Sequence, residues 1–254
     1  MKKENYSIAA FFLASLFIIV LGSCGLEDYP MIYPIPQSNI SPELNDRATV
    51  RINNNNLGSP FTHFVIFYRI YVSDVLNTST TTSTYSSINS VLVSDYNAIL
   101  PYIDSDTLVN SNMDSIIRVN RKYKYLKLLD TDIDSVLSDS VFNRTLVFDF
   151  TSRKFPTMTI DGSSEYILQR SDRNELPDPK PDRYFVNSDD LLDNDYMNEN
   201  SNADVQDKSN MSDMGRYTYA ALFIAAVGTN ATTWSFIYST PSLIHVFLLP
   251  DAWE

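Results

Sequence analysis

Residues 64–72, FVIFYRIYV, form a nearly continuous apolar run rich in β-branched and aromatic side chains. In an extended chain, alternate side chains point to opposite faces, so the even and odd positions of this run would form two faces. Both sets are largely apolar, and Arg69 is the one charged residue among them. The run therefore predicts a central strand that is covered on both sides.

Shorter strand-like segments recur along the chain, and Gly162 after Asp161 supplies a turn between two of them. These segments are residues 48–53, 123–129, 146–151, 155–160, 166–169, 217–227, 234–238 and 243–249, with turns expected at 228–230 and 239–242. Residues 95–103 and 130–141 could each supply a short helix. The series predicts a mainly β fold, an antiparallel β-sandwich with one or two short helices.

Residues 24–46 carry four prolines, which restrict the backbone to extended conformations. We expect this segment to be a tether and residues 47–254 to form the β-sandwich domain. The segment is also rich in apolar side chains, so an alternative is that it packs along the domain. Its apolar residues are Tyr29, Met31, Ile32, Tyr33 and Ile35.

Residues from about 171 to 215 are rich in acids and poor in apolar side chains. A stretch of this composition cannot bury enough apolar surface to order itself. Loops of such length inside a compact domain are either functional or disordered. We therefore expect a long, acidic, mobile insertion between strands of the sandwich.

The N-terminus has the order of a secretory signal, because Lys2 and Lys3 precede an apolar run at residues 8–21. As a helix this run would cover about 21 Å, whereas the hydrocarbon core of a bilayer is about 30 Å thick. The run is short for a permanent span, so residues 1–23 are expected to be a signal peptide.

The next residues, Leu21-Gly22-Ser23-Cys24, resemble the lipobox of bacterial lipoproteins, an aliphatic residue and two small residues before cysteine. The resemblance implies cleavage between Ser23 and Cys24, with diacylglycerol on the Cys24 sulfur and often acylation of the new amino terminus, so palmitate is expected on the protein. It places the protein on the non-cytoplasmic side of a membrane. Gly25 stands where an aspartate retains enterobacterial lipoproteins at the inner membrane, which favours the outer membrane.

Two alternatives to this assignment remain: an ordinary signal peptide followed by a structural cysteine, and an uncleaved membrane anchor. Cys24 is the only cysteine in the chain, so it has no partner for an internal disulfide. A lipid on its sulfur gives this residue a role that the other two interpretations leave without explanation.

Composition excludes several classes of function. The net charge of −12 opposes binding to nucleic acid, and the six glycines form neither of the loops that cradle phosphates. We expect no cofactor and no metal: Asp130, Asp132 and Asp134 imitate the start of a calcium loop, but Ser135 replaces its glycine. The acids at 189–195 also lack loop glycines.

Catalytic motifs are also missing from the sequence. The two histidines, His63 and His245, belong to no zinc motif, and no serine-hydrolase motif is present. One aromatic set near the C-terminus could line a binding face or pack in the core: Tyr217, Tyr219, Trp234, Phe236 and Tyr238.

The body, rich in asparagine, serine and tyrosine, resembles uncharacterised spirochaete lipoproteins, and residues 64–72 resemble the middle strand of fibronectin-type-III-like sandwiches. We expect a lipid-anchored, non-catalytic binding or structural module of the cell envelope, with an envelope protein or glycan as its partner. The alternatives are an envelope hydrolase that uses carboxylates and an accessory subunit of an envelope complex.

Overall fold

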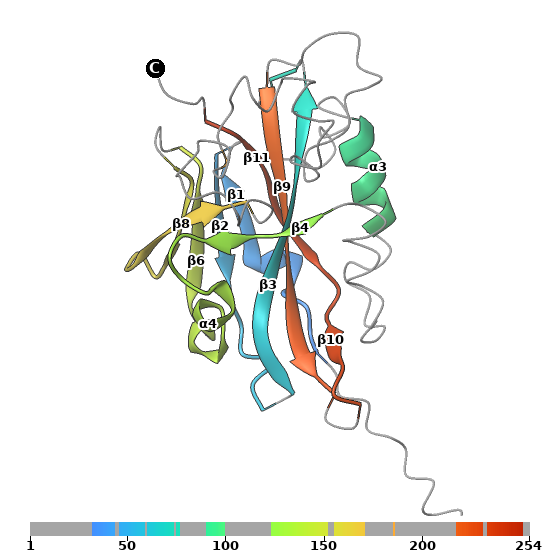
Figure 1. The fold of residues 1–254 in the computed structure, drawn as a ribbon, viewed down its shortest axis with the longest axis vertical. Helices are drawn as coiled ribbons and strands as arrows, with labels where there is room; N and C mark the ends of the chain where they lie inside the picture. Colours follow the sequence, from blue (N-terminus) through green and yellow to red (C-terminus); the bar gives the residue numbers. More distant parts are fainter. Residues whose placement is uncertain are drawn as a thin grey trace, which may run out of the picture. The chain divides into compact units, whose positions relative to one another are not determined.

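The run predicted as a central strand is strand β3, Phe61–Ser73, which pairs antiparallel with β9, Tyr217–Thr229, along its whole length (Figure 1). On its other edge β3 pairs with the short β4, Lys124–Tyr125. Both faces of β3 are buried from Phe64 onward. The predicted central position and two-sided cover are confirmed.

The computed structural model describes residues 32–43, 46–58, 60–73, 75–76, 90–99, 123–151, 155–170, 185, 217–230 and 233–250. These residues belong to one compact unit, Met31–Glu254. The remaining elements are η1 Gln37–Asn39, β1 Ile40–Glu43, β2 Arg47–Arg51, α3 Ser90–Ile99, β5 Lys127–Leu128, α4 Ile133–Val136, η5 Asp139–Val141, β6 Thr145–Asp149, β7 Thr157–Ile160, β8 Glu165–Gln169, β10 Phe236–Tyr238 and β11 Ser242–Leu248.

Two antiparallel sheets form a sandwich-like arrangement, as the sequence predicts. One has the order β1-β2-β6-β7-β8-β5, and the other has the order β10-β9-β3-β4 with β11 also paired to β9. Asp161 and Gly162 have φ of 51° and 69°, and the Ser163 N–H donates to the Ile160 carbonyl. Positive φ at both central residues defines the hairpin turn expected between β7 and β8.

The main core lies between the sheets. Even-numbered side chains of β3 and β9, such as Ile66 and Leu222, face inward-pointing residues of the other sheet, such as Val50, Leu146 and Phe148. The odd-numbered side chains form a second apolar cluster, which contacts Leu92 of α3. The sheet of β3 and β9 is therefore the middle layer. Among the described residues, no helix has the length and apolar character needed to cross a membrane.

The described part of the proline-rich segment packs on the domain. Ile32 and Ile35 are buried, β1 pairs with β2, and the Ser242 hydroxyl donates to the Ile35 carbonyl. Of the two interpretations of this segment, the contacts favour packing for residues 32–43. Apolar burial and a strand at the sheet edge, where Pro42 is tolerated, explain the difference from a tether.

The expected acidic insertion lies outside the described residues except at Phe185. This side chain is fully buried, and its ring meets Tyr68 at 4.8 Å and Phe150 at 6.0 Å between centroids. One aromatic residue of the acidic stretch is thus part of the main core.

The helices and one turn differ from the prediction. α3 begins five residues before the expected helix at 95–103, and the expected helix at 130–141 is the single turn α4 followed by η5. The turn expected at 228–230 starts later, because β9 continues through Gly228 to Thr229. Gly228 is required there for close packing: a Cβ would lie 2.6 Å from both the Ile32 Cδ1 and the Pro60 carbonyl oxygen.

We expect Gly228→Ala to lower the free energy of unfolding by about 1–3 kcal/mol, because the Pro60 carbonyl belongs to the backbone and cannot rotate away. Urea unfolding monitored by circular dichroism would measure the change. Thr229→Ala at the adjacent, partly exposed position is the matched control. Equal stability of the two variants would contradict the close approach.

Candidate functional site

One chain segment belongs to both sheets. β4 pairs with β3, whereas β5, two residues later, pairs with β8 in the other sheet. Between them, the Leu126 N–H donates to the Ile66 carbonyl at 2.8 Å, and the Leu126 side chain is buried in the main core. The crossing leaves the first part of β3 without a neighbouring strand on that side, and a cleft lies there.

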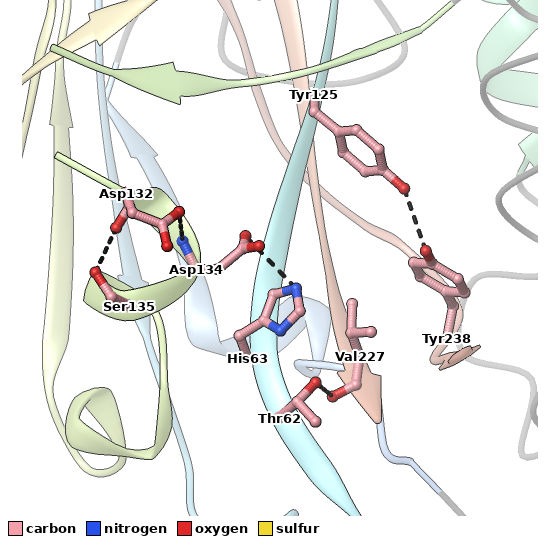
Figure 2. Close-up of polar contacts among 8 residues, drawn as sticks. All are labelled: Thr62, His63, Tyr125, Asp132, Asp134, Ser135, Val227 and Tyr238. Atoms are coloured by element: carbon pink, nitrogen blue, oxygen red, sulfur yellow. Dashed lines mark hydrogen bonds and ion pairs between the residues drawn. The ribbon is translucent and has the colours of Figure 1, made fainter. Parts of the chain in front are cut away.

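Helix α4 stands on one side of this cleft. The Phe64 N–H donates to the Leu137 carbonyl at 2.8 Å, which fastens the end of α4 to β3. This contact brings His63 opposite Asp134, and the His63 Nε2 lies 3.5 Å from an Asp134 carboxylate oxygen (Figure 2). The imidazole is mostly buried and the carboxylate is half exposed. The Asp134 side chain therefore remains accessible to a ligand.

The opposite side is aromatic. The hydroxyl groups of Tyr125 and Tyr238 lie 3.2 Å apart and share a hydrogen bond across strands β4 and β10 (Figure 2). Phe236, two residues before Tyr238 on β10, is 57% exposed. The Tyr125 ring also packs against Phe67 at 5.1 Å between centroids, which fixes its position.

Between these two polar pairs the surface is hollowed to a volume of about 440 Å³. Val65 and Val227 supply apolar lining from β3 and β9, and Lys127 contributes a positive charge. Pockets for small ligands have volumes of this order, with mainly apolar walls and a few polar groups that fix orientation. The cleft has both properties.

The hydroxyl groups near His63 are bonded elsewhere. The Ser135 hydroxyl donates to the Asp132 carbonyl at 2.7 Å, and the Thr62 hydroxyl donates to the Val227 carbonyl at 3.1 Å. Figure 2 shows Ser135 beside Asp132 and away from the imidazole. Asp132 also caps α4, since its carboxylate accepts from the Asp134 N–H at 3.2 Å. Neither hydroxyl group has the bond to a histidine base that an activated nucleophile requires.

A second polar group is buried under α3. Arg69 and Asp95 form an ion pair with side chains 9% and 5% exposed, and the Tyr71 hydroxyl donates to the same Asp95 oxygen at 2.7 Å. The Tyr71 and Tyr123 hydroxyls lie 2.9 Å apart. Burial, followed by Tyr123 and Asp95, raises the pKa of Tyr71 well above its usual value of 10. The hydroxyl stays protonated, and the group joins α3 to β3.

The predicted lipidation residues, Ser23 and Cys24, lie outside the described residues, as do the acids at 189–195. Of the two histidines, His63 lines the cleft, whereas His245 is buried beside Phe247 at 5.1 Å between ring centroids. Within the described ranges, no group of three His, Cys, Asp or Glu residues could hold a metal ion.

The aromatic set is divided between core and surface. Tyr219 is buried and its hydroxyl donates to the Val75 carbonyl, whereas Trp234 and Phe236 are 82% and 57% exposed. Tyr238 lines the cleft. The contributions of Tyr125 and Asp134 to this site were not predicted. The alternation of Tyr123 and Tyr125 along the sequence hinted at the first, but nothing local indicates the partner of His63.

Comparisons with protein-family models, with curated proteins and with solved structures found no match to this chain.

Proposed function

We propose that this chain is a lipid-anchored protein of the cell envelope that binds an envelope glycan in the cleft between α4 and β10, without catalysis. The lipid anchor is proposed from the residues Leu21-Gly22-Ser23-Cys24. Binding is proposed from the cleft, whose apolar lining separates two polar pairs.

The chemistry of the cleft suits a sugar. Saccharide rings present apolar faces of C–H groups and hydroxyl edges, so they need aromatic or apolar contacts together with hydrogen-bonding groups. Tyr238 and Phe236 offer aromatic contacts in the cleft. Its hydrogen-bonding groups are on Asp134, His63 and Lys127. A carboxylate is a strong acceptor for sugar hydroxyls, because hydrogen bonds to charged groups are stronger than neutral ones.

A hydrolase is the second candidate, because the cleft contains two carboxylates. Asp132 is committed to capping α4, and Asp134 faces His63. With the neighbouring Ser135 and Thr62 hydroxyls bonded to backbone carbonyls, binding accounts for more of the observed contacts.

The test is a calorimetric titration of the lipidated protein, held in detergent micelles, with chito-oligosaccharides and with soluble peptidoglycan fragments. We expect Asp134→Asn to weaken binding about tenfold or more, because a hydrogen bond to a charged group contributes about 1.5–3 kcal/mol. Tyr238→Phe should have a smaller effect, since it keeps the ring and removes one hydroxyl.

Asp139→Asn is the matched control, since Asp139 is an exposed acid outside the cleft lining. It should leave affinity unchanged. Failure of the protein to bind any of these saccharides, or equal losses in Asp134→Asn and Asp139→Asn, would count against a glycan in this cleft. Release of shortened sugars during the titration would instead support the hydrolase.

A further inference from the structure

The part of the chain that the structure describes begins at Ile32, beside one end of the β3–β9 pair. We call Ile32 the entry point. The Ile32 side chain packs where a Cβ on Gly228 would lie, and the Tyr33 backbone exchanges two hydrogen bonds with the Asn56 side chain, at 2.7 and 2.9 Å. The Thr229 N–H donates to the Pro60 carbonyl at 3.0 Å. The entry point, the loop before β3 and the end of β9 are therefore neighbours.

This end carries most of the large exposed apolar side chains. Six such side chains are exposed among the described residues, and four of them lie here: Tyr33, Leu57, Trp234 and Phe236, at 43%, 67%, 82% and 57% exposure. We define Tyr33, Leu57 and Trp234 as the tip, and Phe236 lies between the tip and the cleft. Trp234 has φ of 56° and lies in the connection between β9 and β10.

The tip is also without charge. Residues 52–62 and 229–236 contain no Asp, Glu, Lys or Arg, in a chain where 20% of residues are charged. A net charge of −12 would repel most of this protein from anionic headgroups. A neutral surface with exposed tryptophan and leucine is the part that can enter a lipid interface.

The length of chain ahead of Ile32 decides between a lipid surface and other partners. Ile32 is eight positions after Cys24, and a fully extended chain spans at most about 3.5 Å per position. The entry point therefore lies within about 28 Å of a lipid carried on Cys24. The 13 residues of β3 extend about 40 Å, so its far end can lie well beyond that reach.

We propose that the tip inserts Trp234 and Leu57 into the interface of the membrane that holds the lipid, so that the domain has a fixed side toward the bilayer. This inference depends on the proposed lipid anchor. Tryptophan and tyrosine prefer the level of the headgroups, where the ring is apolar and its polar atom meets water. The lipid holds the protein at the surface, and the tip orients it.

The experiment reconstitutes the lipidated protein into phosphatidylcholine vesicles with and without brominated acyl chains. The chain has two tryptophans, Trp234 and Trp253, so Trp253→Phe leaves Trp234 as the sole emitter. We expect its emission to shift to the blue and to be quenched by brominated lipid. Emission typical of water and no quenching would overturn the proposal, as would a blue shift without quenching, which indicates contact between protein copies.

A second variant avoids any dependence on Trp253. Since Cys24 is the only natural cysteine and its sulfur is a diacylglyceryl thioether in the proposed product, Leu57→Cys can carry a single environment-sensitive fluorophore. Ser94→Cys on the exposed side of α3 is the matched control. We expect brominated lipid to quench the label at position 57 and to leave the label at position 94 unaffected.

Flotation of the vesicles separates the two proposals. If the protein floats with vesicles but neither Trp234 nor the label at position 57 is quenched, the tip proposal fails and the lipid anchor stands. If the protein carries no lipid and does not float, the anchor itself fails, and the tip proposal fails with it.

Discussion

Cys24→Ala is expected to abolish incorporation of labelled palmitate and to move the protein out of the membrane fraction. The substitution removes the only thiol in the chain, and the lipobox resemblance assigns the lipid to that sulfur. Lasting attachment needs two or three acyl chains, so losing the site removes all of the binding that they supply. Metabolic labelling followed by fractionation of cells measures both effects.

Ser38→Ala, an exposed position in η1, is the control for expression and export. Mass spectrometry of the natural product adds an independent measurement, since the assignment requires an amino terminus at Cys24. Unchanged palmitate labelling in Cys24→Ala, or a product that retains residues 1–23, would contradict the lipoprotein assignment.

Asp95→Ala is expected to destabilise the domain by about 3–5 kcal/mol, since it leaves the buried Arg69 guanidinium without its carboxylate. The Tyr71 hydroxyl loses an acceptor in the same variant. A loss of this size is a large fraction of the stability of a typical domain. Urea unfolding of the protein, with circular dichroism as the signal, measures it.

The double variant Arg69→Met, Asp95→Ala should recover part of the loss, because it removes both charges from the interior. Glu165→Ala, which removes an exposed acid on β8, is the control and should change stability little. A loss below about 1 kcal/mol in Asp95→Ala would show that the ion pair does not hold α3 on the sheet.

The local sequence pattern predicted those elements whose apolar periodicity or turn residues lie within the element itself. The two apolar faces of β3 follow from its residues alone, and so does the positive-φ turn at Asp161 and Gly162. β1 was missed because its sequence, ISPE, has no strand periodicity and contains a proline. It forms because an edge strand tolerates the missing N–H and because Ile40 is buried.

Features that depend on distant partners could not be predicted. Gly228 looked like a turn residue, but its role is set by Ile32 and Pro60, which approach it from elsewhere in the chain. Likewise, His63 and Asp134 meet only because α4 is bonded to β3. A histidine next to an apolar run could lie in the core, on the surface or in a binding site. For His63, the position of α4 decides which of these applies.

The pairing of β3 with β9 sets the order in which this chain can fold. Partners in the pair are at least 144 positions apart in the sequence, from Ser73 with Tyr217 to Phe61 with Gly228. Contacts between such distant residues form slowly, because closing the long loop between them costs conformational entropy before the contacts can offset that cost. During synthesis, which starts at the N-terminus, β3 is therefore made long before its partner strand β9. Its two apolar faces stay exposed until nearly all of the polypeptide has been made. Until then, the exposed apolar faces of this strand make the unfinished chain prone to aggregation.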